Sequence, residues 1–392
     1  MSDIQAETAV SQARRLNRPK VEAFVRREFS SPQPPPVSER GPLAWIRKNL
    51  VSNWVDALLT IACIVFLYWM LAPLFKFTLI DAVWTGKDRS ACLGPEVGAC
   101  WAMVGEKLGI YMYGFYPPME RWRPNVVGAT GAILLLALVI PGIPLKRYIA
   151  GLLLVVFPVF AFFMLAGGVF GLVEVETARW GGLMLTLVVA VTGITASLPL
   201  GILLALGRRS ELPIVKAFSI AFIEFWRGVP LITVLFMASV MLPLFLPDGV
   251  TFNKLLRALI GVTLFASAYM AEVVRGGLAA IPRGQFEGAQ ALGLSYPKMM
   301  IFIVLPQALK HVIPGIVNTF IGLFKDTTLV YIVGLFDLLE IIKSSFSDVN
   351  WSTPVQSATG FIFAAVIFWI FCFAMSQYSQ YMEKRLDTGH KR

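Results

Sequence analysis

Three long stretches of this sequence contain no charged side chain, and they constrain the fold more than any other feature. They are residues 124–145, 148–173 and 180–207. A helix needs about 20 residues to cross the ~30 Å hydrocarbon core of a bilayer, and each stretch is long enough. Only 15% of the 392 residues are charged, whereas a soluble domain carries about 25%. The sequence therefore predicts an all-α integral membrane protein.

The apolar stretches together indicate about eight transmembrane helices. The expected spans are residues 54–75, 125–143, 149–172, 181–206, 214–246, 255–275, 308–335 and 355–378. The fifth begins as an amphipathic helix and becomes spanning after Pro230. An even number of spans places both termini on one side of the membrane. Lys and Arg gather near both ends of the chain, which indicates that this side is cytoplasmic.

This topology divides the chain into four parts. Residues 1–53 are polar and proline-rich, and we expect a cytoplasmic extension there, not a secretory signal. The other parts are three additional spans in 54–178 with an external loop at about 76–123, a five-helix core in 179–382 with a cytoplasmic loop at about 276–307, and a cytoplasmic tail in 383–392.

Composition argues against several classes of function. The net charge of +10 follows the topology rather than forming a basic and aromatic surface, so nucleic-acid binding is not expected. His311 and His390 are the only histidines, so a histidine-rich metal site is excluded. No G-x-x-x-x-G-K-[ST] motif occurs in the sequence, which means that the chain has no phosphate-binding loop of its own.

The external loop contains two of the four cysteines, in the stretch "CLGPEVGAC". If the loop lies in an oxidising compartment, Cys92 and Cys100 can form a local disulfide. The alternative reading is two unrelated thiols. Cys63 and Cys372 fall in apolar spans and are expected to be inert packing residues.

The cytoplasmic loop is organised in a way that a simple connection would not need. Its stretch "RGQFEGAQAL" favours a short helix, and Phe286, Ala289, Gln290 and Gly293 share one face of it. Gly293 is a natural helix terminator, and Ser295 and Pro297 suit the start of a second short helix. We expect Leu305 and Pro306 to stop this second helix. Small residues on the exposed face would let another protein approach closely.

The same stretch resembles the EAA loop of ABC importer permeases. Its motif positions are occupied by Glu287, Gly288, Ala289, Gly293, Ile303, Leu305 and Pro306. Gly288 stands where the family usually has alanine, which keeps the face small. The resemblance implies that this loop is the coupling helix, which docks in a cleft of a separate ATP-hydrolysing subunit, and that Glu287 lies at that interface.

Further motifs narrow the resemblance. The stretches "IEFWRGVPLITVLF", "AYMAEVVRGGLAAIPRGQFEGAQALGLS" and "LPQALKHVIPGIVNTFIGLFKDTTLV" are similar to polar amino-acid permeases of the histidine/glutamine type. The additional spans resemble the M-type subunit of general L-amino-acid importers. The resemblance implies a non-hydrolysing permease in the bacterial inner membrane. It also implies a Q-type permease partner, two ATPase subunits that bind ATP and Mg, and a periplasmic amino-acid-binding protein; this chain itself binds no cofactor.

Charged residues within the predicted spans allow two readings each. Glu224 and Arg227, like Glu272 and Arg275, lie at i, i+3 spacing, so each pair can partly neutralise itself on one side of a helix. These residues either fix span ends at the membrane surface or order a cytoplasmic gate.

Lys325 and Asp326 are adjacent in the seventh span, so they do not face each other. They are expected to meet other helices or water, and the resemblance puts them near the translocation pathway.

Two other functions would fit a polytopic membrane chain. An ion-coupled secondary transporter would explain the charges in the spans, but it would leave the EAA-like loop without a role. A membrane enzyme is disfavoured because the sequence offers no paired-carboxylate or nucleophile constellation. Of the three, the permease subunit of an amino-acid importer accounts for most of the sequence.

Overall fold

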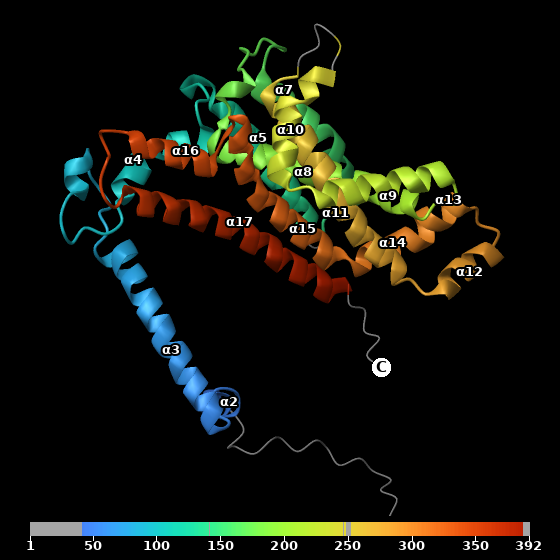
Figure 1. The fold of residues 1–392 in the computed structure, drawn as a ribbon, viewed down its shortest axis with the longest axis horizontal. Coiled ribbons are helices and arrows are strands. Elements are labelled where there is room, and N and C mark those ends of the chain that lie inside the picture. Colours follow the sequence, from blue (N-terminus) through green and yellow to red (C-terminus); the bar gives the residue numbers. More distant parts are fainter. Residues whose placement is uncertain (1–40, 141, 246, 248–251, 387–392) are drawn as a thin grey trace, which may run out of the picture. The chain divides into compact units, whose positions relative to one another are not determined.

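The computed structural model describes residues 41–140, 142–245, 247 and 252–386, and these residues are mostly helical (Figure 1). In this described part, 7 helices are long and apolar enough to cross a membrane, or up to 8 if a bent pair is one span. The prediction of an all-α membrane protein with about eight spans is confirmed.

The chain divides into two compact units, residues 1–73 and 74–392. In the first, α2 (Pro42–Asn49) precedes α3 (Trp54–Phe75), which continues into the second unit. The Thr60 hydroxyl donates to the Leu50 carbonyl at 2.7 Å and so ties α3 to the segment before it. Of the predicted extension 1–53, residues 1–40 lie outside the described residues.

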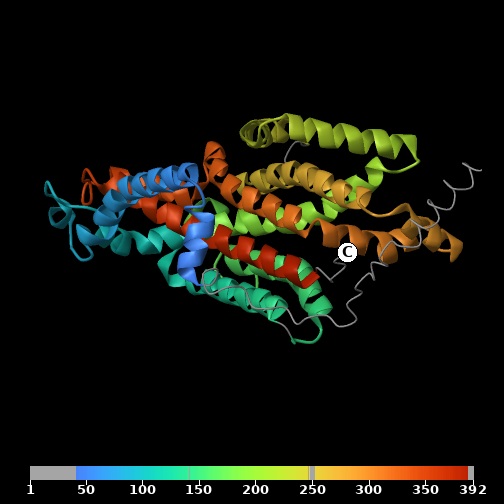
Figure 2. The same ribbon diagram turned by 90° about the horizontal axis from the view of Figure 1, so that it is seen from below.

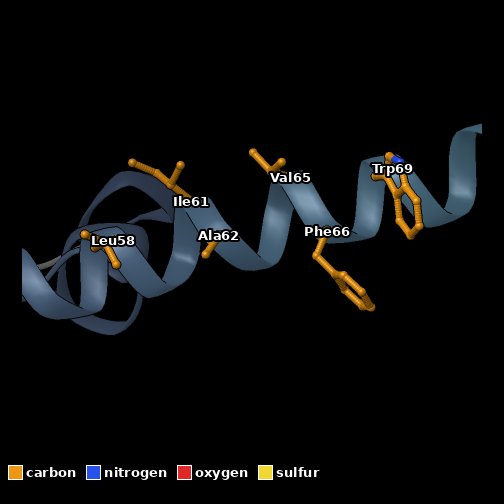
Figure 3. Close-up of a pocket in the computed structure, with 6 residues that line it drawn as sticks. All are labelled: Leu58, Ile61, Ala62, Val65, Phe66 and Trp69. Carbon is orange, nitrogen blue, oxygen red and sulfur yellow. The ribbon is translucent and has the colours of Figure 1, made fainter.

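No side chain of α3 is buried. Figure 3 shows six of them projecting from this one helix: Leu58, Ile61, Ala62, Val65, Phe66 and Trp69. An apolar helix surface of this kind suits contact with lipid chains or with another apolar helix, because its backbone groups are already hydrogen-bonded internally.

Among the described residues, the second unit contains the other helices and one very short strand. They are α4 (Trp101–Tyr113), α5 (Trp122–Val139), α6 (Lys146–Gly151), α7 (Phe157–Ala166), α8 (Gly182–Arg208), α9 (Pro213–Gly228), α10 (Leu231–Val240), α11 (Lys254–Ala279), α12 (Arg283–Ala291), α13 (Tyr296–Met299), α14 (Leu305–His311), α15 (Ile313–Asp326), β1 (Phe336–Asp337), α16 (Leu338–Ser344) and α17 (Gln356–Leu386). Short π-helical turns lie at Lys76–Ile80, Leu152–Val156 and Met300–Val304, and 3₁₀ turns at Arg89–Cys92, Pro118–Glu120, Thr177–Arg179, Leu242–Phe245, Thr327–Val333 and Ser345–Ser347.

The fifth predicted span is broken. The chain bends by 105° between helices α9 and α10. Val229, between them, has extended backbone angles (φ −107°, ψ 133°), as expected of a residue that precedes a proline. The sequence signal at Pro230 therefore marks a sharp bend and not only a change from amphipathic to apolar.

Close packing of α8 against α11 forms the centre of the second unit. A Cβ at Gly201 of α8 would lie 2.7 Å from Met270 of α11, and one at Gly193 would lie 3.1 Å from Val262. Glycines at these positions let the two helix backbones approach closely, which is how helices associate where no hydrophobic effect drives them together.

The predicted external loop is an ordered layer. We call residues 76–121 and 336–356 the outer layer; it lies at the end of the bundle opposite α12 and α13, as α4 and α16 show in Figures 1 and 2. Cys92 and Cys100 form a disulfide in it. The Tyr111 hydroxyl is 2.8 Å from the Ser345 hydroxyl, Lys107 pairs with Asp348, and the N–H of Arg89 donates to the Asn350 carbonyl at 2.9 Å.

The outer layer is joined to α8 where three glycines cross. Gly114 and Gly182 have left-handed backbone angles (φ +63° and +62°), and a Cβ at Gly114 would lie 2.4 Å from the Cα of Gly181. A side chain at position 114 would therefore be strained by its backbone and would overlap the opposing chain.

We expect Gly114→Ala to lower the free energy of unfolding by about 2–4 kcal/mol, from left-handed strain and overpacking together. Thermal unfolding of the purified chain in lipid nanodiscs measures this. Gly105→Ala is the matched control, because it lies in α4 with nothing within 4 Å of its Cβ. It should stabilise the chain by about 0.5–1 kcal/mol, and equal losses in both variants would contradict the crossing.

The outer layer also contains a buried carboxyl group, that of Asp337. It accepts hydrogen bonds from the N–H groups of Leu339 and Glu340, both at 3.1 Å, and so caps α16. Burial raises its pKa to about 6; the two backbone hydrogen bonds lower the pKa, the Glu340 carboxylate raises it, and the Lys343 ammonium lowers it.

The raised pKa of Asp337 predicts how stability depends on pH. Between the unfolded pKa of about 3.9 and the folded pKa of about 6, the folded chain binds more protons, so its stability should fall as pH rises. We expect Asp337→Asn, which keeps the cap, to remove this part of the slope. Thermal unfolding at several pH values tests it, and parallel curves for both proteins would refute it.

Candidate functional site

The EAA-like stretch folds as a short helix, a corner and a second helix. The corner is Gly293, whose φ of +70° few other residues adopt. Around it, the N–H of Leu294 donates to the Ala289 carbonyl at 3.2 Å, and the N–H of Gly293 donates to the Gln290 carbonyl at 2.9 Å. This pair of bonds is the Schellman arrangement that ends a helix, so the sequence correctly placed the end of α12 at this glycine.

Helix α12 presents different residues to the bundle and to solvent. Ala289 is 2% exposed and packs in a cluster with Met299 and Val304, while Phe286 and Leu294 lie against that cluster. Glu287 and Gly288 are exposed, and a Cβ at Gly288 or Gly293 would meet nothing within 4 Å.

The outward face of α12 is therefore an open, small-residue surface with one carboxylate. Of the four residues expected on one face, Phe286 and Ala289 turn towards the chain's own core and Gln290 and Gly293 are exposed. Position 288, where glycine stands in the EAA-like motif, is on the open side.

The expectation that Leu305 and Pro306 stop the second helix is wrong. Helix α13 continues through the π-helical turn Met300–Val304 into α14, which ends only at His311. In the π-helical turn the N–H of Leu305 bonds to the Met300 carbonyl, and Pro306 follows in the first turn of α14, where its missing N–H is tolerated. Ile303 and Leu305 are partly buried against the same cluster as Ala289.

A cluster of five charged residues lies at the α12 end of α8 and α11. We call it the ionic cluster; its members are Arg208 of α8, Glu224 and Arg227 of α9, and Glu272 and Arg275 of α11. The Glu272 carboxylate is its centre: Arg208 Nη1 is 2.8 Å from Oε1, Arg275 Nη2 is 2.9 Å from Oε2, and Arg227 Nη1 is 3.7 Å from Oε2. Three helices are thus tied to one side chain.

The pairing differs from the i, i+3 pattern in one respect. Glu272 and Arg275 do pair along their helix, but no ion pair joins Glu224 to Arg227 among the described residues. Glu224 lies 3.0 Å from Arg208 instead. Sequence reasoning missed Arg208, whose signal was its position directly after the uncharged span 180–207.

The structure does not bring Lys325 and Asp326 to the ionic cluster. They form the last turn of α15, which begins beside α14 and leads towards β1. Lys325 is exposed and Asp326 partly buried, and neither has an ion pair within the part of the chain that the structure describes. In the same described part, no group of three or more His, Cys, Asp or Glu side chains could hold a metal ion.

Comparison with known proteins identifies a family whose model matches this chain. The family model "Binding-protein-dependent transport system inner membrane component" matches residues 197–388. The inner membrane amino-acid ABC transporter permease protein YhdY of Escherichia coli (strain K12) is 51% identical over 359 residues, which cover 91% of this chain and 96% of YhdY.

A second relative and one solved structure were also found. The glutamate/glutamine/aspartate/asparagine transport system permease protein BztC of Rhodobacter capsulatus is 41% identical over 436 residues, covering 94% of this chain and 99% of BztC. A chain in the crystal structure of an amino acid ABC transporter with histidines is 27% identical, with a TM-score of 0.46, over 52% of this chain and 92% of that chain.

Removing the charge of Glu272 should destabilise the ionic cluster. We expect Glu272→Gln to lower the free energy of unfolding by about 1–3 kcal/mol, because three arginines lose their common partner. Glu224→Gln is the control: its side chain is 55% exposed and has one arginine partner, against 17% for Glu272, so we expect about 1 kcal/mol or less. Chemical unfolding in nanodiscs compares the two, and equal losses would show that Glu272 is not the centre.

Proposed function

The chain belongs to the family of binding-protein-dependent transport system inner membrane components, among the amino-acid ABC transporter permeases, and from this premise we propose that it imports L-amino acids as the transmembrane permease of an ATP-driven importer. The family consists of permease subunits, not hydrolases. The names of YhdY and BztC refer to amino-acid transport, which supports this class of substrate.

The observation that carries the proposal is the outward face of α12. Glu287, Gly288 and Gly293 are exposed beside a corner that the chain's own hydrogen bonds define, and a Cβ added at Gly288 or Gly293 would meet no atom of the described residues within 4 Å. A rigid helix with an open face suits the cleft of another protein, because little of its order has to be gained on binding. We assign this face to an ATPase subunit.

The ionic cluster is the proposed cytoplasmic gate. Its five side chains tie α8, α9 and α11 together. Because α12 follows α11 directly in the chain, a movement of α12 can reach α11 and, through these ion pairs, α8 and α9. Nucleotide binding and the loaded binding protein would each favour one arrangement only through different affinities for the two states. Lys325 and Asp326 remain candidates for the translocation pathway.

The proposed assembly contains several other chains. It consists of this permease, a second permease of the Q type in a heteropair, two ATPase subunits that bind ATP and Mg, and a periplasmic amino-acid-binding protein. The chain itself would bind no cofactor. It would lie in the bacterial inner membrane with both termini cytoplasmic, which puts α12 on the ATPase side and the outer layer on the side of the binding protein.

Affinity purification from native membranes tests the coupling surface. We expect the native chain to bring down an ATPase and a second permease, and the double variant Glu287→Ala, Gly293→Val to lose the ATPase alone. Valine at position 293 would cost about 1–2 kcal/mol in a left-handed backbone and would add bulk to the docking face. Mass spectrometry identifies the accompanying chains.

Gly142→Val is the matched control for the glycine substitution. Gly142 also has a positive φ, of +92°, and open space around its Cβ, but it lies between α5 and α6. This variant should keep the ATPase. A native chain that purifies alone and transports in liposomes under an ion gradient would overturn the importer and favour a secondary transporter.

A further inference from the structure

Arg209, at the end of α8, contacts two other elements with one side chain. Its Nη1 donates to the carbonyl oxygen of Leu278 at 3.1 Å. Its guanidinium carbon lies 5.5 Å from the centre of the Phe286 ring. Leu278 is in the last turn of α11, and Phe286 is in α12, so the guanidinium stands where three helices meet.

Both contacts are of kinds that orient a helix. The last carbonyls of a helix have no partner within it and attract a cation, because they carry the negative end of the helix dipole. A guanidinium over an aromatic face is held by the ring quadrupole. Arg209 can satisfy both because its planar group has several donors and two faces.

Arg209 is preceded by Arg208, which makes a different set of contacts. Arg208 reaches Glu224 and Glu272 in the ionic cluster, while Arg209 reaches α12. Two consecutive arginines thus connect the end of α8 to the ionic cluster on one side and to α12 on the other. Within the described residues, the side-chain hydrogen bond between α12 and a different helix joins Gln285 to Gln307 of α14, at 3.1 Å, while Arg209 reaches α12 through the Phe286 ring.

We propose that Arg209 is a positioning residue that fixes α12 against the ends of α8 and α11 through Phe286 and the Leu278 carbonyl. A displacement of α12 then pulls on α8 directly beside the ionic cluster. This inference rests on the proposed function, in which α12 receives the force from the ATPase. The contact itself belongs to this chain alone, so it can be measured without any partner.

The first experiment measures the mobility of α12 in the full-length chain in lipid nanodiscs. A nitroxide is attached to Gly288→Cys, an exposed position with open space around its Cβ, in a background of Cys63→Ser and Cys372→Ser. We expect Arg209→Ala and Phe286→Leu each to sharpen the electron paramagnetic resonance lines. Arg209→Lys, which keeps the donor and the charge, should restore part of the effect.

The double variant Arg209→Ala, Phe286→Leu tests whether the two residues act through one shared contact or independently. If Arg209 and Phe286 act through each other, the double variant is no more mobile than either single variant. Arg283→Ala, which removes an exposed arginine of α12 itself, should leave the spectrum unchanged. Unchanged spectra for Arg209→Ala, or additive effects in the double variant, would overturn the proposal.

The second experiment uses the assembled transporter. We expect Arg209→Ala to retain the ATPase on purification but to lower the turnover number of transport by about 2- to 30-fold, the range of coupling changes of 0.5–2 kcal/mol. Retained turnover with a mobile α12 would overturn the transmitting role. If the native chain binds no ATPase, the proposed function fails, while the mobility result still tests the contact.

Discussion

The close contact between α8 and α11 is the interaction on which the rest of the second unit depends. Gly193 and Gly201 let the two helices approach closely, and the approach brings Arg208 within reach of Glu272 and Arg209 within reach of the α11 carboxyl end. A large side chain at either glycine would separate the helices and would weaken both contacts. The ionic cluster and the contacts of Arg209 that position α12 therefore depend on backbone packing in the middle of the bundle, not on the local sequence around the charges.

Much of the fold could be predicted from the sequence because lipid imposes a simple rule. Uncharged stretches of sufficient length must be helices that satisfy their own backbone groups, and such stretches at 124–145 and 180–207 proved helical over most of their length. What could not be predicted depends on distant contacts. The connection 76–123 contains α4 and packs against residues 336–356, and no periodicity in either segment indicates the other.

In the candidate site, too, local features could be predicted from the sequence and distant contacts could not. Gly293 could be recognised because a glycine after a helical pattern is a local signal of a left-handed corner. Pro306 led to a wrong prediction of a helix end, because the sequence does not reveal the adjoining π-helical turn that lets the helix continue. The sequence does not indicate the partners of Arg208 and Arg209, because these partners are 16 or more residues away. The i, i+3 rule succeeded for Glu272 and Arg275 and gave no contact for Glu224 and Arg227, where a third helix supplies the partner.

The way the disulfide loop is seated determines when the chain can finish folding. Cys92 and Cys100 are 8 residues apart, so their loop can close soon after it is synthesised. The N–H of Cys100, however, donates to the Thr359 hydroxyl, 259 residues later in the chain, and Lys107 pairs with Asp348, 241 residues later. Contacts this distant in sequence form late. If synthesis stopped before α17, the disulfide loop would be closed but would lack the hydrogen bond to Thr359. The beginning of the second unit is therefore completed only when its last helix has been made.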